Sequence, residues 1–231
     1  MPPQPYQFKT FKYNSHYWLL QLCAREKRPL RILDVGTADG YLGAALKEQG
    51  HSLVGVEKES SSATRAREHY DTFHRVDIEE FDFPYRNEFD VVIFADVLEH
   101  LRCPEVILQR CLPCLKRTGQ VYVSVPNIAN LFIRMSLLFG RFDYSERGIL
   151  DKTHLRFFTH AAVRRMFNES GYRVLQTVPT PIPLQIVIPA TNHRVFGPLH
   201  ELHYLLVCAW KTLFAYQFVL RAVANVSIKN F

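Results

Sequence analysis

A short apolar strand followed at once by a turn of small residues and a helix is the feature that most constrains this chain of 231 residues. Residues 30–35 have the apolar character of a buried strand, the turn extends from Gly36 to Gly40, and a helix is expected to begin near Tyr41. Small residues let backbone N–H groups approach a ligand closely, and the positive end of the helix points at the same place. The arrangement predicts a site for a nucleotide-like ligand.

A second apolar strand is expected over residues 52–57 and ends on Glu57, about twenty residues after the turn. A carboxylate at this position can accept hydrogen bonds from both hydroxyl groups of a ribose. The two features together are far more specific than a glycine-rich turn alone.

The spacing of small residues in the turn argues against a dinucleotide cofactor. The pattern G-x-G-x-x-G would have its glycines at the positions of Gly36, Ala38 and Tyr41, so an aromatic residue replaces the glycine needed for close helix packing. Asp34 and Asp39 would repel a pyrophosphate, whereas they would attract a sulfonium cation with an amino-acid tail. The residues favour a cofactor that has a ribose and an adenine but no phosphates, and an NAD-dependent oxidoreductase is the alternative.

Strands and helices alternate along the chain, which predicts an α/β fold: a Rossmann-like, doubly wound, seven-stranded and mostly parallel sheet with one antiparallel strand near the C-terminus. Lys211 interrupts the apolar C-terminal region, and the alternation within residues 213–221 favours a last strand inserted in the sheet over a membrane anchor. The expected helices are 15–26, 40–49, 60–70, 104–116 and one from the N-cap Thr159 to Gly171; the expected strands are 30–35, 52–57, 73–76, 90–95, 120–125 after a turn at 117–119, 172–177 and 213–221.

Four blocks of the sequence resemble the class I S-adenosylmethionine-dependent methyltransferases. They are LDVGTADG at 33–40, VGVE at 54–57, VDIE at 76–79 and DVVIFADVLEHL at 90–101, and the resemblance extends over roughly residues 15–225. The last block and residues 148–159 are similar to the branch of ubiquinone-type O-methyltransferases and bacterial small-molecule or glycan methyltransferases. The turn departs from the usual G-x-G-x-G at Ala38, which implies a small loss of cofactor affinity.

The resemblance implies that the cofactor is S-adenosylmethionine. No metal is expected. Asp34 and the turn backbone would hold the methionine tail, and Glu57 would accept the ribose hydroxyls. Asp77 would accept the adenine amino group, with Ile78 against the ring, although Asp77 also fits a role as a turn cap. The implied cofactor-binding residues are Asp34, Gly36, Thr37, Ala38, Asp39, Gly40, Glu57, Lys58, Asp77, Ile78, Asp96 and Val97.

Two residues are candidates for the catalytic site. Asp96 follows the fourth strand, at the carboxyl edge where ligands of such sheets bind. His154 is the candidate general base for a hydroxyl acceptor, because an imidazole titrates near the working pH. The alternative for His154 is a hydrogen-bonded set with Asp151 and Thr153 that fixes the loop.

Two neighbours of Asp96 are given structural roles. Glu99 is expected to cap the helix that follows it, and His100 is more often a structural neighbour than a catalyst in such a block.

Positive charge is concentrated in one segment. The formal net charge is +6, and residues 130–175 contain eight cations and four anions, which gives +4 of that total. Such a segment fits a solvated helical face, an acidic acceptor group or an anionic membrane surface. Nucleic acid is not expected as a partner, because no binding motif accompanies the charge.

The termini and the cysteines indicate the compartment. Residues 1–5 lack the apolar run of a signal peptide and no uncharged apolar stretch of about eighteen residues is present, which predicts a cytoplasmic enzyme, with membrane-surface contact as an open alternative. Five cysteines without framework spacing are expected to be reduced thiols, and Cys111 and Cys114 are expected to be packing residues rather than half of a metal site.

Residues 1–231 are expected to form one methyltransferase domain, with residues 127–158 as an insertion that covers the acceptor. Within it, residues 130–139 predict an apolar helix that acts as a lid, rests on a bilayer to collect a lipid-linked acceptor, or packs on the sheet. The sequence therefore predicts O-methylation of a small hydroxylated acceptor, such as a sugar, a quinol or phenol, or a lipid-linked intermediate. A protein that binds the cofactor without turnover is the other alternative.

Overall fold

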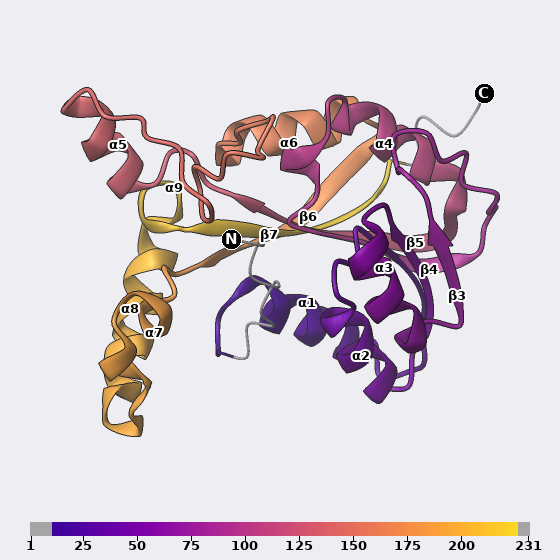
Figure 1. Cartoon of the computed structure of the whole chain (residues 1–231), viewed down its shortest axis with the longest axis horizontal. Coiled ribbons are helices and arrows are strands. Elements are labelled where there is room, and N and C mark those ends of the chain that lie inside the picture. Colours follow the sequence, from indigo (N-terminus) through magenta and orange to yellow (C-terminus); the bar gives the residue numbers. More distant parts are fainter. Residues whose placement is uncertain (1–10, 226–231) are drawn as a thin grey trace.

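The strands of residues 11–225, the part that this computed structural model describes, form one seven-stranded sheet in the order β3-β2-β1-β4-β5-β7-β6 (Figure 1). β7 runs antiparallel to β5 and β6, and the other neighbouring pairs are parallel. The expected fold class, including the inserted last strand, is confirmed. The strands are β1 (Arg31–Val35), β2 (Ser52–Glu57), β3 (Thr72–Arg75), β4 (Phe89–Ala95), β5 (Leu115–Pro126), β6 (Tyr172–Thr180) and β7 (Gln217–Ala224).

Helices cover both faces of the sheet, because its central strands are apolar on both sides. On one face, Leu33 and Val35 pack in a core with α4 and α6; on the other, Ile32 packs in a core with α1 and α2. Figure 1 shows these two layers above and below the strands. The helices are α1 (Ser15–Ala24), α2 (Tyr41–Glu48), α3 (Ser60–Ala66), α4 (Pro104–Cys111), α5 (Leu131–Leu138), α6 (His160–Glu169), α7 (Leu184–Val187), α8 (Gly197–Ala209) and α9 (Lys211–Phe214).

The expected turn at 117–119 is wrong, because these residues lie inside β5. Phe89 pairs with Leu115, but the next pairing joins Val91 to Gln120, so four residues of β5 lie opposite Asp90 alone. Lys116 stays at this irregularity through an ion pair with Asp90 (2.8 Å). The turn-forming composition of the segment therefore makes a bulge.

Several element ends also differ from expectation. The helices expected over 60–70 and 104–116 end at Ala66 and Cys111 and continue as single 3₁₀ turns. The strand expected over 213–221 begins at Gln217, because Lys211–Phe214 forms α9. Thr159 is confirmed as the N-cap of α6, accepting a hydrogen bond from the Ala162 N–H.

The cysteines and helices bear on two further expectations. All five cysteines are free, with Cys23, Cys111 and Cys114 buried, as expected for packing thiols. Within residues 11–225, none of the helices is long and apolar enough to cross a bilayer. The expectation for residues 1–5 lies outside the described residues.

Close packing of α2 against Tyr70, which follows the 3₁₀ turn after α3, depends on Gly43. A Cβ atom built at Gly43 would lie 2.3 Å from the Tyr70 ring. Gly43→Ala is therefore expected to lower the free energy of unfolding by about 1–3 kcal/mol, measured by urea denaturation.

Gly197→Ala is the matched control, because no atom lies within 4 Å of its added Cβ. An equal loss of stability in both variants would contradict the packing role of Gly43.

Candidate active site

The turn after β1 is shaped by backbone conformations that small residues adopt most easily. Gly36, Ala38 and Gly40 all have positive φ (72°, 45° and 81°). A Cβ atom at Gly36 would lie 2.6 Å from a methyl group of Val97, so the turn packs directly against the end of β4. α2 begins at Tyr41, so its N-terminal end meets the turn as predicted.

Glu57 lies at the end of β2 and holds the turn in place. One of its carboxylate oxygens accepts from the Ala38 N–H and the other from the Glu59 N–H, both at 2.8 Å. Each oxygen retains a further lone pair for another donor. Glu57 therefore both supports the turn and presents an acceptor beside it.

Asp77 follows β3, the strand next to β2. Its carboxylate pairs with Lys58 (2.5 Å) and accepts from the Glu79 N–H (3.0 Å), and these contacts lower its pKa. The turn-cap role weighed for Asp77 is thus present, while Ile78 packs partly buried beside the core on the α4 side. Lys58 contacts Asp77 in this structure.

Asp34 lies beneath the turn and is almost completely buried, at 1% exposure. The Tyr70 hydroxyl donates to it at 2.6 Å. Burial raises the pKa of Asp34 to about 6; the Tyr70 hydrogen bond opposes this rise, and the charge of Glu57 adds to it. Asp34 therefore supports the turn from below.

The raised pKa makes stability depend on pH. Below about pH 4 Asp34 is protonated in both the folded and the unfolded chain, whereas at higher pH folding must bury a charge. Asp34→Asn, which removes this charge but can still accept from Tyr70, is expected to gain up to about 3 kcal/mol relative to wild type as the pH rises from 4 through 6. Urea denaturation at pH 4 and pH 8 measures the gain, and a constant difference between the two proteins would contradict it.

Asp39 is directed toward α3. Its carboxylate accepts from Arg65 (2.5 Å) and from the Ser62 hydroxyl (2.8 Å), and it is buried. Thr37, also buried, contributes its carbonyl to the Gly40 N–H (2.9 Å). These two members of the predicted set therefore fix the shape of the turn.

Asp96 joins three strands at the end of β4. It has a positive φ of 57°. Its carboxylate accepts from the Gln217 amide (2.9 Å) and from the Ser124 hydroxyl, and its N–H donates to the Ser124 hydroxyl at 3.0 Å. Because a non-glycine residue in this conformation is strained, the contacts with β5 and β7 hold Asp96 at the sheet edge.

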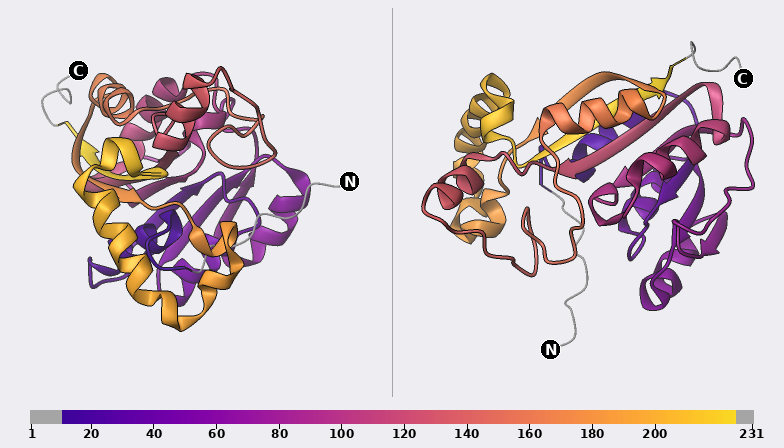
Figure 2. Two further views of the ribbon diagram at one scale, coloured as in Figure 1. Left: turned by 90° about the vertical axis from the view of Figure 1, so that its left-hand side faces the viewer. Right: turned by 90° about the horizontal axis from the view of Figure 1, so that it is seen from above.

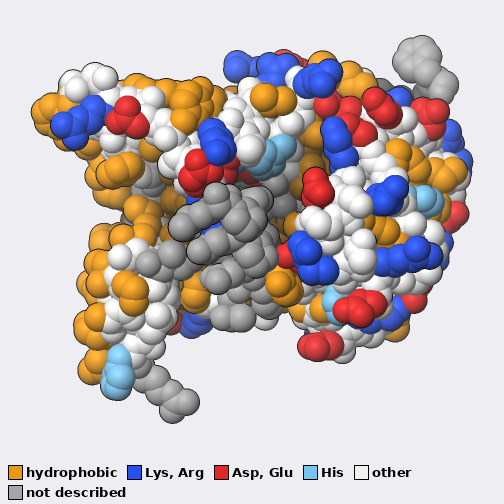
Figure 3. Space-filling model, viewed as in Figure 1, with side chains coloured by type: hydrophobic (Ala, Val, Ile, Leu, Met, Phe, Trp, Pro, Cys, Tyr) orange, Lys and Arg blue, Asp and Glu red, His pale blue; other side chains and the backbone are white. Residues whose placement is uncertain are grey.

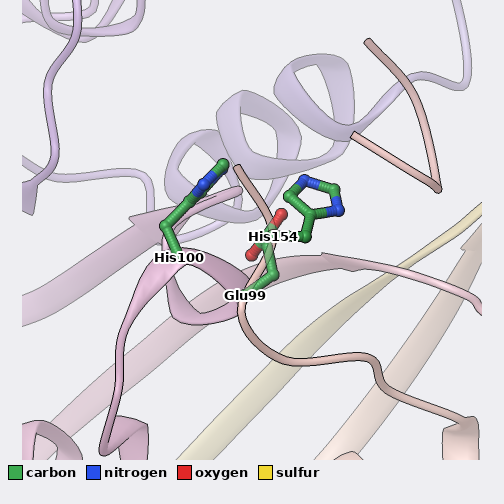
Figure 4. A group of neighbouring side chains, drawn as sticks. All are labelled: Glu99, His100 and His154. Atoms are coloured by element: carbon green, nitrogen blue, oxygen red, sulfur yellow. The ribbon is translucent and has the colours of Figure 1, made fainter. Parts of the chain in front are cut away.

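His154 lies in the loop before α6, against the residues that follow Asp96 (Figure 4). Its Nδ1 is 3.1 Å from the Ile149 carbonyl. Since a carbonyl oxygen only accepts, Nδ1 carries the proton and Nε2 of the neutral ring keeps its lone pair. Burial and the nearby His100 lower the pKa of His154, which favours this neutral form.

The loop that carries His154 is also locked by local hydrogen bonds. Asp151 accepts from the Thr153 N–H (2.8 Å) and hydroxyl (2.7 Å). His154 donates from Nδ1 to the Ile149 carbonyl, so it also belongs to the hydrogen bonds that fix this loop. The loop-fixing role that was the alternative for His154 is therefore present, while its Nε2 remains available for a proton.

The expected role of Glu99 as a helix cap is wrong. Cys103 is the N-cap of α4, while Glu99 lies in a 3₁₀ turn (Leu98–His100) with its side chain buried toward the loop. Its carbonyl accepts from the Leu155 N–H (2.8 Å) and the Arg156 N–H (2.9 Å). The tertiary contact with the loop replaces the local cap.

Glu99, His100 and His154 each offer one ligand atom, and these atoms lie within 4.8 Å of one another (Figure 4). Two imidazole nitrogens and a carboxylate oxygen are suitable ligands for a divalent transition-metal ion. The sequence prediction of no metal did not anticipate this group, because its members come from two distant segments.

The ends of four adjacent strands thus carry the predicted residues in sheet order. Asp77 follows β3, Glu57 ends β2, the turn follows β1, and Asp96 and Val97 follow β4. Neighbouring strands are about 4.8 Å apart, so the row extends roughly 14 Å. An elongated ligand can lie along it, from Asp77 to the end of β4.

Comparison with known proteins identifies the family. A model of the methyltransferase domain matches residues 10–177, which is most of the chain. The chain belongs to this methyltransferase family. The resemblance to class I S-adenosylmethionine-dependent methyltransferases is therefore confirmed.

Two similar curated proteins are ubiquinone biosynthesis O-methyltransferases. That of Bradyrhizobium diazoefficiens is 36% identical over 104 residues, which are 42% of this chain and 40% of the relative. That of Rhodopseudomonas palustris is 26% identical over 180 residues, which are 74% of this chain and 64% of the relative. The chain thus spans less than two thirds of the length of these relatives.

A solved structure with the same fold is the magnesium protoporphyrin IX methyltransferase of Synechocystis PCC 6803 with bound SAH. The two folds superpose with a TM-score of 0.62 at 15% identity, covering 90% of this chain and 81% of that one. At this identity, the similarity concerns the fold.

Sequence reasoning missed the residues that support the site from a distance. Tyr70 beneath Asp34, and Ser124 and Gln217 beside Asp96, carry no local motif. Gln217 is 121 residues from Asp96 along the chain. The inserted strand expected over residues 213–221 contains it, but that strand begins at Gln217 only in the structure.

Proposed function

We propose that this methyltransferase transfers the methyl group of S-adenosylmethionine to a hydroxyl group of a small acceptor with an apolar part. The observation that carries the proposal is the row of turn, Glu57, Asp77 and Asp96 at four adjacent strand ends. It offers a carboxylate acceptor for a ribose at Glu57, and Tyr41 stands where the third glycine of a dinucleotide-binding turn would be. The relatives' name, O-methyltransferase, supports an oxygen acceptor.

In this proposal the cofactor lies along the strand ends. The backbone of the turn holds the methionine tail, with Asp34 supporting it from below, and Glu57 accepts the ribose hydroxyls. Asp77 accepts the adenine amino group beside Ile78, and the donor methyl group lies toward Asp96.

Methyl transfer is a single displacement in which positioning provides most of the catalysis. The acceptor oxygen forms a bond to the methyl carbon while the carbon–sulfur bond breaks, leaving S-adenosylhomocysteine. His154 Nε2 takes the hydroxyl proton and then releases it to solvent. Asp96, held by Ser124 and Gln217, orients the groups at the reaction centre.

Residues 127–158 are proposed to cover the acceptor. Asn127 anchors the segment by donating to the Ala215 carbonyl (2.9 Å), and Asn130 caps α5. Beside α5, a cavity of about 470 Å³ is lined largely by apolar side chains, including Leu131, Phe132 and Phe214. The lining suits an apolar acceptor, such as a phenol or quinol, better than an unmodified sugar.

The proposal is tested by measuring the transfer of a radioactive methyl group from S-adenosylmethionine to each of a panel of phenolic, quinol and glycosidic acceptors. Methylation of apolar phenols or quinols, with the label on oxygen, is the expected result. Methylation on nitrogen or carbon, or of polar sugars only, would contradict it.

The pH profile of the same reaction is expected to show an acidic limb. The pKa of His154 is lowered from its ordinary value of about 6.5, mainly by burial. The imidazole is therefore a neutral base at pH 6.5 and above, and the base is lost as the pH falls through the lowered pKa. Rates of the wild-type enzyme between pH 4.5 and 8 measure this limb. An inflection well above pH 6.5 would assign it to another group.

A further inference from the structure

Exposed large apolar side chains are concentrated in two segments of this chain. Of the twenty such side chains in the described residues, sixteen lie between residues 131 and 144 or between residues 187 and 210. Both segments lie beyond the carboxyl ends of β5 and β6, at the same end of the molecule (Figure 2). Figure 3 shows apolar surface on both of the lobes that they form.

α5 displays an apolar stripe where a surface helix normally buries one. Leu131, Phe132, Met135, Leu138 and Phe139 recur at the spacing of a single helical face. Phe132 is 69% exposed, and Leu138 and Phe139 are each 73% exposed. Ile133 is the one buried residue of the helix and packs with Ile149 and Leu150, while Asn130 caps the helix.

α8 repeats this arrangement from a different part of the chain. Leu199, Leu202 and Leu206 lie on one face and are exposed, and Val207 is the buried residue of the helix. Trp210, 59% exposed, follows directly. Indole rings favour the boundary between apolar and aqueous phases, as do leucine-rich faces of interfacial helices.

The charges on these segments select among possible partners. Residues 131–144 and 187–210 contain three cations (Arg134, Arg141 and Arg194) and two anions (Asp143 and Glu201), and Lys211 follows directly. Glu201 is paired with Lys12 at 2.7 Å. An anionic bilayer complements this excess of cations, whereas a second copy of the chain would bring like charges together.

The apolar cavity opens between the two helices. Leu131, Phe132 and Met135 of α5 line it together with Leu206 and Val207 of α8. Phe214, another lining residue, precedes Gln217 by three residues, which is roughly 10 Å of chain, and Gln217 contacts Asp96. The cavity therefore has one lining residue within about 10 Å of chain from a residue that contacts Asp96.

We propose that α5 and α8 together dock on an anionic phospholipid bilayer, with the cavity between them open to the membrane so that an apolar acceptor enters from the lipid. The docking itself follows from the surface, and only the entry of the acceptor rests on the proposed function.

Co-sedimentation with vesicles tests the docking. Wild-type protein is expected to bind vesicles of phosphatidylglycerol and phosphatidylcholine at least 10-fold more tightly than phosphatidylcholine alone, because of its cations. Leu138→Asp plus Phe139→Asp on α5, and Leu202→Asp plus Leu205→Asp on α8, are each expected to weaken this binding at least 10-fold. None of these four residues lines the cavity.

Val106→Asp plus Leu175→Asp is the matched control, since both residues are exposed outside the two segments. Equal loss of binding in this control, or no binding of folded wild type, would overturn the proposal. So would dimerisation through α5 and α8, measured by sedimentation equilibrium. Because vesicle binding needs no cofactor, its failure is distinguishable from failure of the methyltransferase assignment, which S-adenosylmethionine titration measures.

Discussion

Replacing His154 by alanine is expected to lower kcat about 10²–10⁴-fold, the range that a general base contributes. The affinity for S-adenosylmethionine should change little, because His154 lies outside the row of residues at the ends of β3, β2, β1 and β4 that is proposed to bind the cofactor. The loss should be smaller at high pH, where the acceptor hydroxyl ionises without help. Single-turnover rates and cofactor titration of the same preparation separate the two effects.

The loop-locking alternative for His154 predicts a different result for His154→Asn. An asparagine amide nitrogen reaches about as far from Cβ as Nδ1 does, so it can still donate to the Ile149 carbonyl, but it has no basic nitrogen. If His154 is the base, the asparagine variant is as slow as the alanine variant while keeping its melting temperature. Near-normal turnover in His154→Asn would show that the histidine only locks the loop, and His193→Ala, at an exposed histidine, is the control.

Glu57→Ala should weaken binding of both S-adenosylmethionine and S-adenosylhomocysteine about 10²–10⁴-fold. Two hydrogen bonds from ribose hydroxyls to a carboxylate contribute about 1.5–3 kcal/mol each, and every 1.4 kcal/mol is about tenfold in affinity. The Ala38 and Glu59 N–H groups also lose their acceptor in this variant, which loosens the turn. Isothermal titration calorimetry measures the change.

Two further variants give this experiment its controls. Glu57→Gln retains one oxygen acceptor and is expected to fall between wild type and alanine. Glu68→Ala removes an exposed carboxylate from the 3₁₀ turn after α3 and is expected to bind like wild type. Wild-type affinity in Glu57→Ala would exclude Glu57 as the ribose acceptor.

The half of the site nearest the N-terminus could be predicted because its signals are local. Gly36, Ala38 and Gly40 each need an unusual backbone conformation, and Glu57 ends a strand that directly pairs with β1. In a parallel sheet, the carboxyl ends of neighbouring strands lie at one edge. These residues are therefore brought together by the pairing of β1 with β2 alone, without contacts from the rest of the chain.

The other half depends on contacts between distant segments. Asp96 is held by Ser124 and Gln217, and Glu99 packs against the loop of His154 rather than capping α4. A capping pattern considers only neighbours along the chain, so it could not anticipate a buried carboxylate between two histidines. The bulge in β5 has the same origin, because the sheet extended pairing through residues whose composition favours a turn.

The periodicity of apolar residues also could not predict which helix faces are exposed to solvent. The spacing of apolar residues in 130–139 correctly predicts a helix, but an apolar stripe ordinarily faces the core. Only the structure shows that the stripe of α5 is outside and that α8 displays a second one at the same end of the molecule (Figure 2).

Calorimetric titration of the purified wild-type protein with S-adenosylmethionine, S-adenosylhomocysteine and NADH tests the central assignment most directly. The row of residues along β3, β2, β1 and β4 predicts micromolar binding of both sulfur compounds and no binding of NADH. A folded protein that binds neither sulfur compound, or that binds NADH more tightly, would contradict the assignment.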